Sequence, residues 1–80
     1  MSKKIKRDYK EIAKTNTFMA NAAEIREICL VQNVDVGVAV DMYITNRHLH
    51  RTEELMAKAR DFRAYCRETP LKEIVAELEK

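Results

Sequence analysis

The chain has 80 residues, one glycine, one proline and a formal net charge of +2, with 46% hydrophobic and 35% charged residues. This much apolar material excludes an intrinsically disordered chain, and the scarcity of glycine and proline excludes collagen-like and linker sequences. No apolar segment is long enough to serve as a signal sequence or to cross a bilayer, so we expect one soluble, cytoplasmic domain over residues 1–80 with no membrane contact.

The N-terminal segment is basic and predicts a short helix over residues 3–15. Ile5, Tyr9 and Ile12 recur at helical spacing, which places them on one apolar stripe of an otherwise charged helix. The polar sequence "TNT" at 15–17 then interrupts the stripe, because these residues favour helix caps over helix interiors.

A second helix is predicted over residues 17–32. Its apolar stripe includes Phe18, Ile25 and Cys29, which lie on one face at helical spacing. Asn33 is the predicted stop, because asparagine tolerates the left-handed backbone conformation that ends many helices.

The stretch "NVDVGVAVDMYITN", residues 33–46, alternates valine with small or acidic residues, which is the pattern of a half-buried β-strand. A strand here would find no second strand in the chain, so it would have to pair across a dimer, as in ribbon-helix-helix proteins. Those proteins place the ribbon at the start of the domain, whereas more than thirty residues precede this stretch. We therefore favour the helical alternative, in which Asp35 is the N-cap and Gly37 costs about 1 kcal/mol relative to alanine.

In the helical alternative, an apolar seam continues through the middle of the chain without a slip. A seven-residue rhythm held this long is typical of a packing seam, and it predicts one long central helix over about 36–67. The members of the seam follow one another at steps of three or four residues: Val38, Met42, Thr45, Leu49, Thr52, Met56, Ala59, Phe62 and Cys66.

The last element is a short helix over residues 70–79. Pro70 disfavours a helical Thr69 and suits the first position of a new helix, so the long helix has to end here. The predicted fold class is therefore all-α, a small helical bundle in which three shorter helices surround one long central helix.

The predicted central helix presents more apolar surface than one short chain can cover, and a core of this size is marginal by itself. We therefore expect a homo-oligomer, and a non-enzymatic regulatory or inhibitory protein that acts by docking on another protein. The seam would supply the anchors of a helix-in-groove contact. The predicted protein-interface residues are Met42, Tyr43, Leu49, Met56 and Phe62.

Two basic zones, residues 3–14 and 47–51, leave open a nucleic-acid or nucleotide-phosphate binding protein. The sequence "RHLHR" at 47–51 places two histidines between two arginines, and such side chains bind phosphate. The two zones would share a face if the first helix folded back beside the middle of the central helix. The candidate phosphate or nucleic-acid contacts are Lys3, Lys4, Lys6, Arg7, Arg47, His48, His50 and Arg51.

Catalytic, cofactor and metal sites are not expected. The chain has no glycine-rich phosphate loop and no pattern typical of a nucleophile with its base. His48 and His50 would point about 200° apart on a helix, so they cannot share a metal ion. Residues 24–43 resemble the hydrophobic skeleton of a helix-turn-helix motif, but residues 36–41, which would read the bases, include no Arg, Lys, Asn or Gln.

Overall fold

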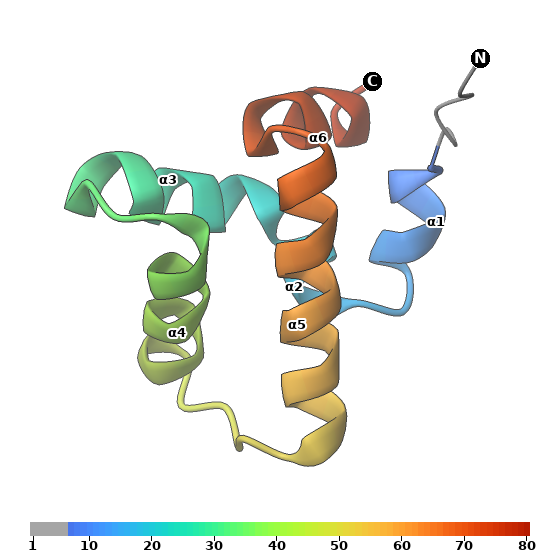
Figure 1. Ribbon diagram of the computed structural model, residues 1–80. Helices are drawn as coiled ribbons and strands as arrows, with labels where there is room; N and C mark the ends of the chain where they lie inside the picture. Colours follow the sequence, from blue (N-terminus) through green and yellow to red (C-terminus); the bar gives the residue numbers. More distant parts are fainter. Residues whose placement is uncertain (1–6) are drawn as a thin grey trace.

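The computed structural model describes residues 7–80, and every regular element in that range is a helix. The helices are α1 (Tyr9–Ala13), α2 (Thr17–Ala20), α3 (Ala22–Gln32), α4 (Val36–Asn46), α5 (Glu53–Glu68) and α6 (Leu71–Leu78). Figure 1 shows α4 and α5 running antiparallel, with α3 across the start of α4 and α6 across the end of α5. The predicted all-α fold class is therefore confirmed.

The core lies where α2, α3, α4 and α5 meet. The Phe18 ring on α2 is fully buried, and its centroid lies 5.9 Å from the Tyr43 ring on α4 and 6.4 Å from the Phe62 ring on α5. Ile25 on α3 and Ile74 on α6 are also fully buried and extend the same cluster. One apolar cluster thus joins the described helices, with α4 and α5 as two of its walls.

The start of α4 confirms the helical interpretation of the valine-rich stretch. Asp35 is extended, and its carboxylate accepts a hydrogen bond from the Val38 amide at 2.9 Å, as predicted for an N-cap. Ala39 and Val40 point into the core, so burial follows helical spacing and not alternation. Asn33 ends α3 in the left-handed conformation, with a φ of 54°, also as predicted.

The single long helix predicted over 36–67 is wrong, because residues 47–52 separate α4 from α5. His48 adopts the left-handed conformation with a φ of 54°, and the Leu49 amide donates back to the Ile44 carbonyl at 3.1 Å. This is a Schellman motif, in which the residue after the left-handed one makes an apolar contact with the helix it ends. Leu49 accordingly packs against the core.

A new helix begins after the break, and its own capping residues mark the start. The Thr52 hydroxyl accepts a hydrogen bond from the Leu55 amide at 3.1 Å. Glu53 and Glu54 occupy the first turn, where carboxylates interact favourably with the helix dipole. Because α5 turns back along α4, the predicted seam is not one continuous stripe. Ala59 and Phe62 enter the core, whereas Val38, Thr45 and Met56 stay exposed.

The remaining helices differ less from expectation. α6 agrees with the predicted helix over 70–79 to within one residue at each end. Asn21 separates α2 from α3, so the helix predicted over 17–32 is divided in two. α1 occupies the later part of the helix predicted over 3–15, of which residues 3–6 lie outside the described range.

No single helix among residues 7–80 combines the length and apolar composition needed to span a bilayer. The pair α3 and α4 meets that test only when the two are taken together, and it is bent by 109° at the connection.

Candidate functional site

The candidate functional site is a surface groove between α4 and α5, which we call the α4–α5 groove. Two adjoining hollows, of about 220 Å³ and 390 Å³, share Gly37 and Arg63 in their walls. The first is lined mainly by apolar side chains, including Val38 and Met56. The second lies against the first turn of α4 and includes Arg67. Asp35 lines the second hollow beside the two arginines, so the groove is mainly apolar at one end and carries both charges, with an excess of positive charge, at the other.

The apolar end of the groove is accessible. Val38 on α4 is 46% exposed and Met56 on α5 is 37% exposed. Leu30 and Val31, at the end of α3, are more exposed but line neither hollow. Single exposed apolar side chains are normal on protein surfaces, so Val38 and Met56 alone would not identify a site. The charges beside them distinguish this one.

The sides of α5 differ in character, because successive residues are rotated by about 100° around a helix axis. Ala59 and Phe62 lie on the buried face. Arg60, Arg63 and Arg67, which we call the arginine row, recur at steps of three and four residues on the same flank as Met56. The other flank is acidic and includes Glu54, Asp61 and Glu68.

The arginine row has no acidic partner among the described residues. The two carboxylates of α4 and its cap are used elsewhere, since Asp35 caps the helix and Asp41 pairs with Arg51 at 2.6 Å. The Nε atom of Arg63 is buried without a hydrogen-bond acceptor in residues 7–80. Like charges four residues apart oppose helix formation, so Arg63 and Arg67 together cost the free protein about 0.2–0.5 kcal/mol.

The arginines that the sequence suggested as phosphate contacts are engaged within the chain. Arg7 pairs with Glu68 at 2.9 Å, and Arg47 donates two hydrogen bonds to the Glu24 carboxylate. Arg51 pairs with Asp41, as described above. These hydrogen bonds stabilise the charged forms, so they raise the pKa of Arg7 and Arg47 and lower the pKa of Glu68.

Of the first predicted basic zone, the structure places Arg7 far from the second zone. Arg7 lies beside Glu68 at the C-terminal end of α5, whereas residues 47–51 precede its N-terminal end. A helix of 16 residues is about 24 Å long, so the length of α5 separates Arg7 from residues 47–51. His48 and His50 are exposed. Three of the predicted contacts lie outside the described residues: Lys3, Lys4 and Lys6.

The predicted protein-interface residues divide between the core and the surface. Tyr43 and Phe62 are 4% and 0% exposed, so both are core residues that a partner cannot reach in this fold. Met42 and Leu49 are half-buried. Met56 is the member of the predicted set that is both exposed and part of the groove.

The predicted resemblance to a helix-turn-helix motif extends to the geometry. α3 and α4 are joined by three residues and bent by 109°, within the range of that motif. However, α4 contains no Arg, Lys or Gln, and its solvent side carries Val38, Asp41 and Thr45. A carboxylate there would repel phosphate, so the geometry occurs without a surface that reads bases.

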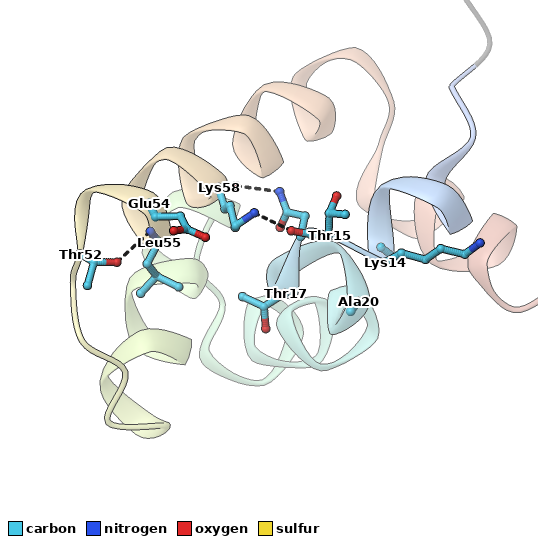
Figure 2. A pocket seen from close by; sticks show the side chains of 10 residues that line it. Lys14, Thr15, Thr17, Ala20, Thr52, Glu54, Leu55 and Lys58 are labelled. Atoms are coloured by element: carbon cyan, nitrogen blue, oxygen red, sulfur yellow. Dashed lines mark hydrogen bonds between the residues drawn. The ribbon is translucent and has the colours of Figure 1, made fainter.

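A larger hollow, of about 590 Å³, lies between the α1–α2 connection and the start of α5 (Figure 2). Lys58 reaches across it and donates a hydrogen bond to the Thr15 carbonyl at 2.6 Å. Thr52, also in its wall, caps α5. The Lys58 ammonium group and the Thr52 hydroxyl are therefore already engaged in hydrogen bonds within the chain. Within the described part of the chain, no three His, Cys, Asp or Glu side chains gather as ligands for a metal ion.

The arginine row is absent from the predicted sites, although the sequence contained a signal for it. None of Arg60, Arg63 and Arg67 has an acidic residue three or four positions away. Helical arginines on a solvated surface are commonly balanced at that spacing, as Lys14 is by Glu11 at 3.1 Å. A row of unbalanced arginines on one helix flank therefore leaves a local positive charge on the surface.

The thiols provide a test of the packing beside the groove. Burial raises the pKa of Cys66 to about 12, with a smaller contribution from the neighbouring Cys29, whereas an unfolded thiol titrates near about 8.5. Between those values the native state keeps a proton that the unfolded state releases, so stability falls as the pH rises. We therefore compare the free energy of unfolding, measured by urea titration, at about pH 8 and about pH 10, near the start of this window. We expect it to fall less in Cys66→Ala than in the wild type. Cys29→Ala, which removes a less buried thiol, should change the slope less; equal slopes in wild type and Cys66→Ala would contradict the burial.

Comparison of the chain with protein-family models, curated proteins and solved structures found no match. Geometry, burial and charge are therefore the grounds on which a function can be proposed.

Proposed function

We propose that this is a non-enzymatic regulatory or inhibitory protein that docks a helical segment of another protein in the α4–α5 groove. The observation that supports this most directly is the exposure of Val38 and Met56 in a groove bordered by arginines without acidic partners. A groove between two packed helices suits an amphipathic helix, which inserts one apolar face. Met56 has a flexible thioether side chain that can adapt to such a face.

The apolar contacts would give the docking its affinity. Fully burying a side chain of the size of valine or methionine is worth about 1.5–3 kcal/mol. Val38 and Met56 are already partly covered, so each would gain a fraction of that amount. The expected affinity is therefore moderate, in keeping with a regulatory contact that forms and dissociates.

A homo-oligomer also stays a prediction, but the uncovered apolar seam of one long helix is no longer an argument for it. It was expected because a continuous seam would have been too long for one chain to cover. With the seam folded back, Ala59 and Phe62 are buried within the chain itself. We therefore propose a different protein as the occupant of the groove.

Nucleic-acid or nucleotide-phosphate binding is the alternative proposal. It now depends on the arginine row together with His48 and His50, since Arg7, Arg47 and Arg51 each hold a carboxylate of the same chain. An anion would have to displace those carboxylates before it could use the paired arginines. The apolar side chains within the groove favour a protein partner over a phosphate backbone.

Met56→Glu is expected to weaken binding of the partner at least about tenfold, because a carboxylate in an apolar contact removes more than 1.4 kcal/mol. Ala76→Glu, an exposed site on α6, makes the same change in charge and should leave the affinity unchanged. The partner would be isolated from nuclease-treated extract of the source cells on the wild-type protein and then titrated, purified, against each variant by calorimetry.

Equal affinity of wild type and Met56→Glu for the purified partner would refute docking in the groove. A retained ligand that disappears after nuclease treatment, and that binds the purified protein with a steep salt dependence, would instead support the nucleic-acid alternative.

A further inference from the structure

The arginine row indicates the chemistry of the segment that the groove accepts. We infer that the docked helix is acidic along one edge, with carboxylates spaced to meet Arg60, Arg63 and Arg67 while its apolar face covers Val38 and Met56. This inference rests on the docking function proposed above and specifies the partner of the same site.

The spacing of the row suits a second helix. Steps of three and four residues place successive arginines about 4.5 and 6 Å apart along the axis of α5. Carboxylates at positions i, i+3 or i+4, and i+7 of another helix recur at the same distances. A partner helix lying along the groove can therefore meet all three arginines from one edge.

The electrostatics of the free protein favour such a partner. Arg63 and Arg67 repel each other, and the buried Nε atom of Arg63 has no acceptor within the described range. A carboxylate between the two guanidinium groups would relieve the repulsion, and a planar guanidinium group can hold a carboxylate with two parallel bonds. Asp35 and Asp41 do not fulfil this role, because the first caps α4 and the second holds Arg51.

Other surface cations do not offer a comparable site. Lys14 and Lys80 are paired with glutamates at i,i+3 spacing. Lys58 is committed to the Thr15 carbonyl. Lys72 has no ion pair with another residue of 7–80, but it is the single basic residue of α6. The arginine row is thus a concentrated, unbalanced positive edge beside an accessible apolar hollow, which is charge complementarity for an acidic amphipathic helix.

The experiment uses a displayed library of helical peptides of about five turns, roughly 18 residues, with all surface positions randomised. Selection is carried out on the purified 80-residue protein, with counter-selection on Met56→Glu so that only groove binders are kept. The expected result is enrichment of Asp and Glu at three positions spaced as i, i+3 or i+4, and i+7. The best peptide is then titrated against wild type and variants.

Arg60→Glu with Arg67→Glu is expected to weaken that peptide at least about tenfold, because both sites are exposed and the change replaces attraction by repulsion. The matched control, Lys14→Glu with Lys72→Glu, makes the same change in net charge on other helices and should stay within about twofold. Selection repeated on the charge-reversed double variant should enrich Lys and Arg at the same spacing.

The other outcomes separate the docking function from the acidic character of the docked helix. Groove binders without acidic enrichment would overturn the inference and leave docking intact, as would acidic peptides that ignore the double substitution. No enrichment over the counter-selected variant would overturn docking and the inference together. In a homodimer, the acidic flank of α5 of one copy could bind the arginine row of the other. Sedimentation of the wild type would then give a dimer that the double substitution dissociates, and this result would overturn the proposal that a different protein occupies the groove.

Discussion

Replacing Phe62 by alanine is expected to lower the free energy of unfolding by about 3–5 kcal/mol. The side chain is 0% exposed, and its ring centroid lies 6.4 Å from that of Phe18. Phe18 meets the Tyr43 ring edge-on at 5.9 Å, so a cavity at position 62 loosens the contact of α5 with α2 and, through it, with α4. A domain of this length has a total stability of about 4–12 kcal/mol, so the loss is a large share of it. Urea denaturation followed by far-UV circular dichroism measures the change.

Met56→Ala is the matched control on the same helix. Met56 is 37% exposed, so its truncation should cost less than about 1 kcal/mol. If Phe62→Ala lost no more than the control, Phe62 would not lie in the core, and the placement of the groove beside it would be wrong. If the loss depended on protein concentration, Phe62 would lie in an interface between chains, as the seam originally suggested.

Helix boundaries that depend on local chemistry could be predicted from the sequence. Asp35 has the oxygen that an N-cap needs, Asn33 tolerates the left-handed conformation, and Pro70 cannot continue a helix. Each of these signals acts within a few residues. The helix type of the valine-rich stretch followed from the same reasoning, because a strand there would have had no partner.

The break at 47–52 could not be predicted from the apolar pattern. Steps of three and four residues occur in one long helix and in two separate helices alike, so the apolar spacing does not distinguish the two arrangements. In α4 the buried residues are not those of the predicted seam: Ala39, Val40, Tyr43 and Ile44. The residues at the break itself favour two helices. Thr52 followed by Glu53 and Glu54 is a typical helix start, and histidine is one of the residues that tolerates the conformation found at His48.

The candidate site was also only partly predictable from the sequence. The ion pairs that engage Arg7 and Arg47 join residues far apart in the chain, so their occupation depends on the fold and not on the sequence nearby. The absence of acidic neighbours around the arginine row is a local property and could have been read directly. A net charge summed over a segment does not reveal the arginine row, because the acidic residues of α5 cancel its charge in the sum although they lie on a different flank of the helix.

Asn16→Ala is expected to destabilise the protein by about 2–4 kcal/mol, more than an ordinary helix cap, because the groups it leaves unpaired are buried. The Asn16 side chain accepts hydrogen bonds from the amides of Phe18 and Met19 at 3.0 and 3.2 Å. Both of those residues are 0% exposed. The side-chain amide also donates to the Lys58 carbonyl at 3.0 Å, which ties α2 to α5. Alanine removes all three bonds, and water cannot replace the two at the buried amides.

Thr52→Ala provides the comparison, since Thr52 caps α5 at an exposed site and should cost only about 1 kcal/mol. Asn16→Asp keeps the acceptor for the two amides but turns a carboxylate oxygen toward the Lys58 carbonyl, so we expect an intermediate loss of about 1–2 kcal/mol. Chemical denaturation of the three variants separates the contribution of the two hydrogen bonds from buried amides from that of the hydrogen bond to the Lys58 carbonyl. If Asn16→Ala cost no more than Thr52→Ala, the amides of α2 would be reaching water, and the junction of α2 with α5 would be open. The predicted order, Asn16→Ala worst and Thr52→Ala mildest, follows from burial, because the same kind of cap is replaced at both positions.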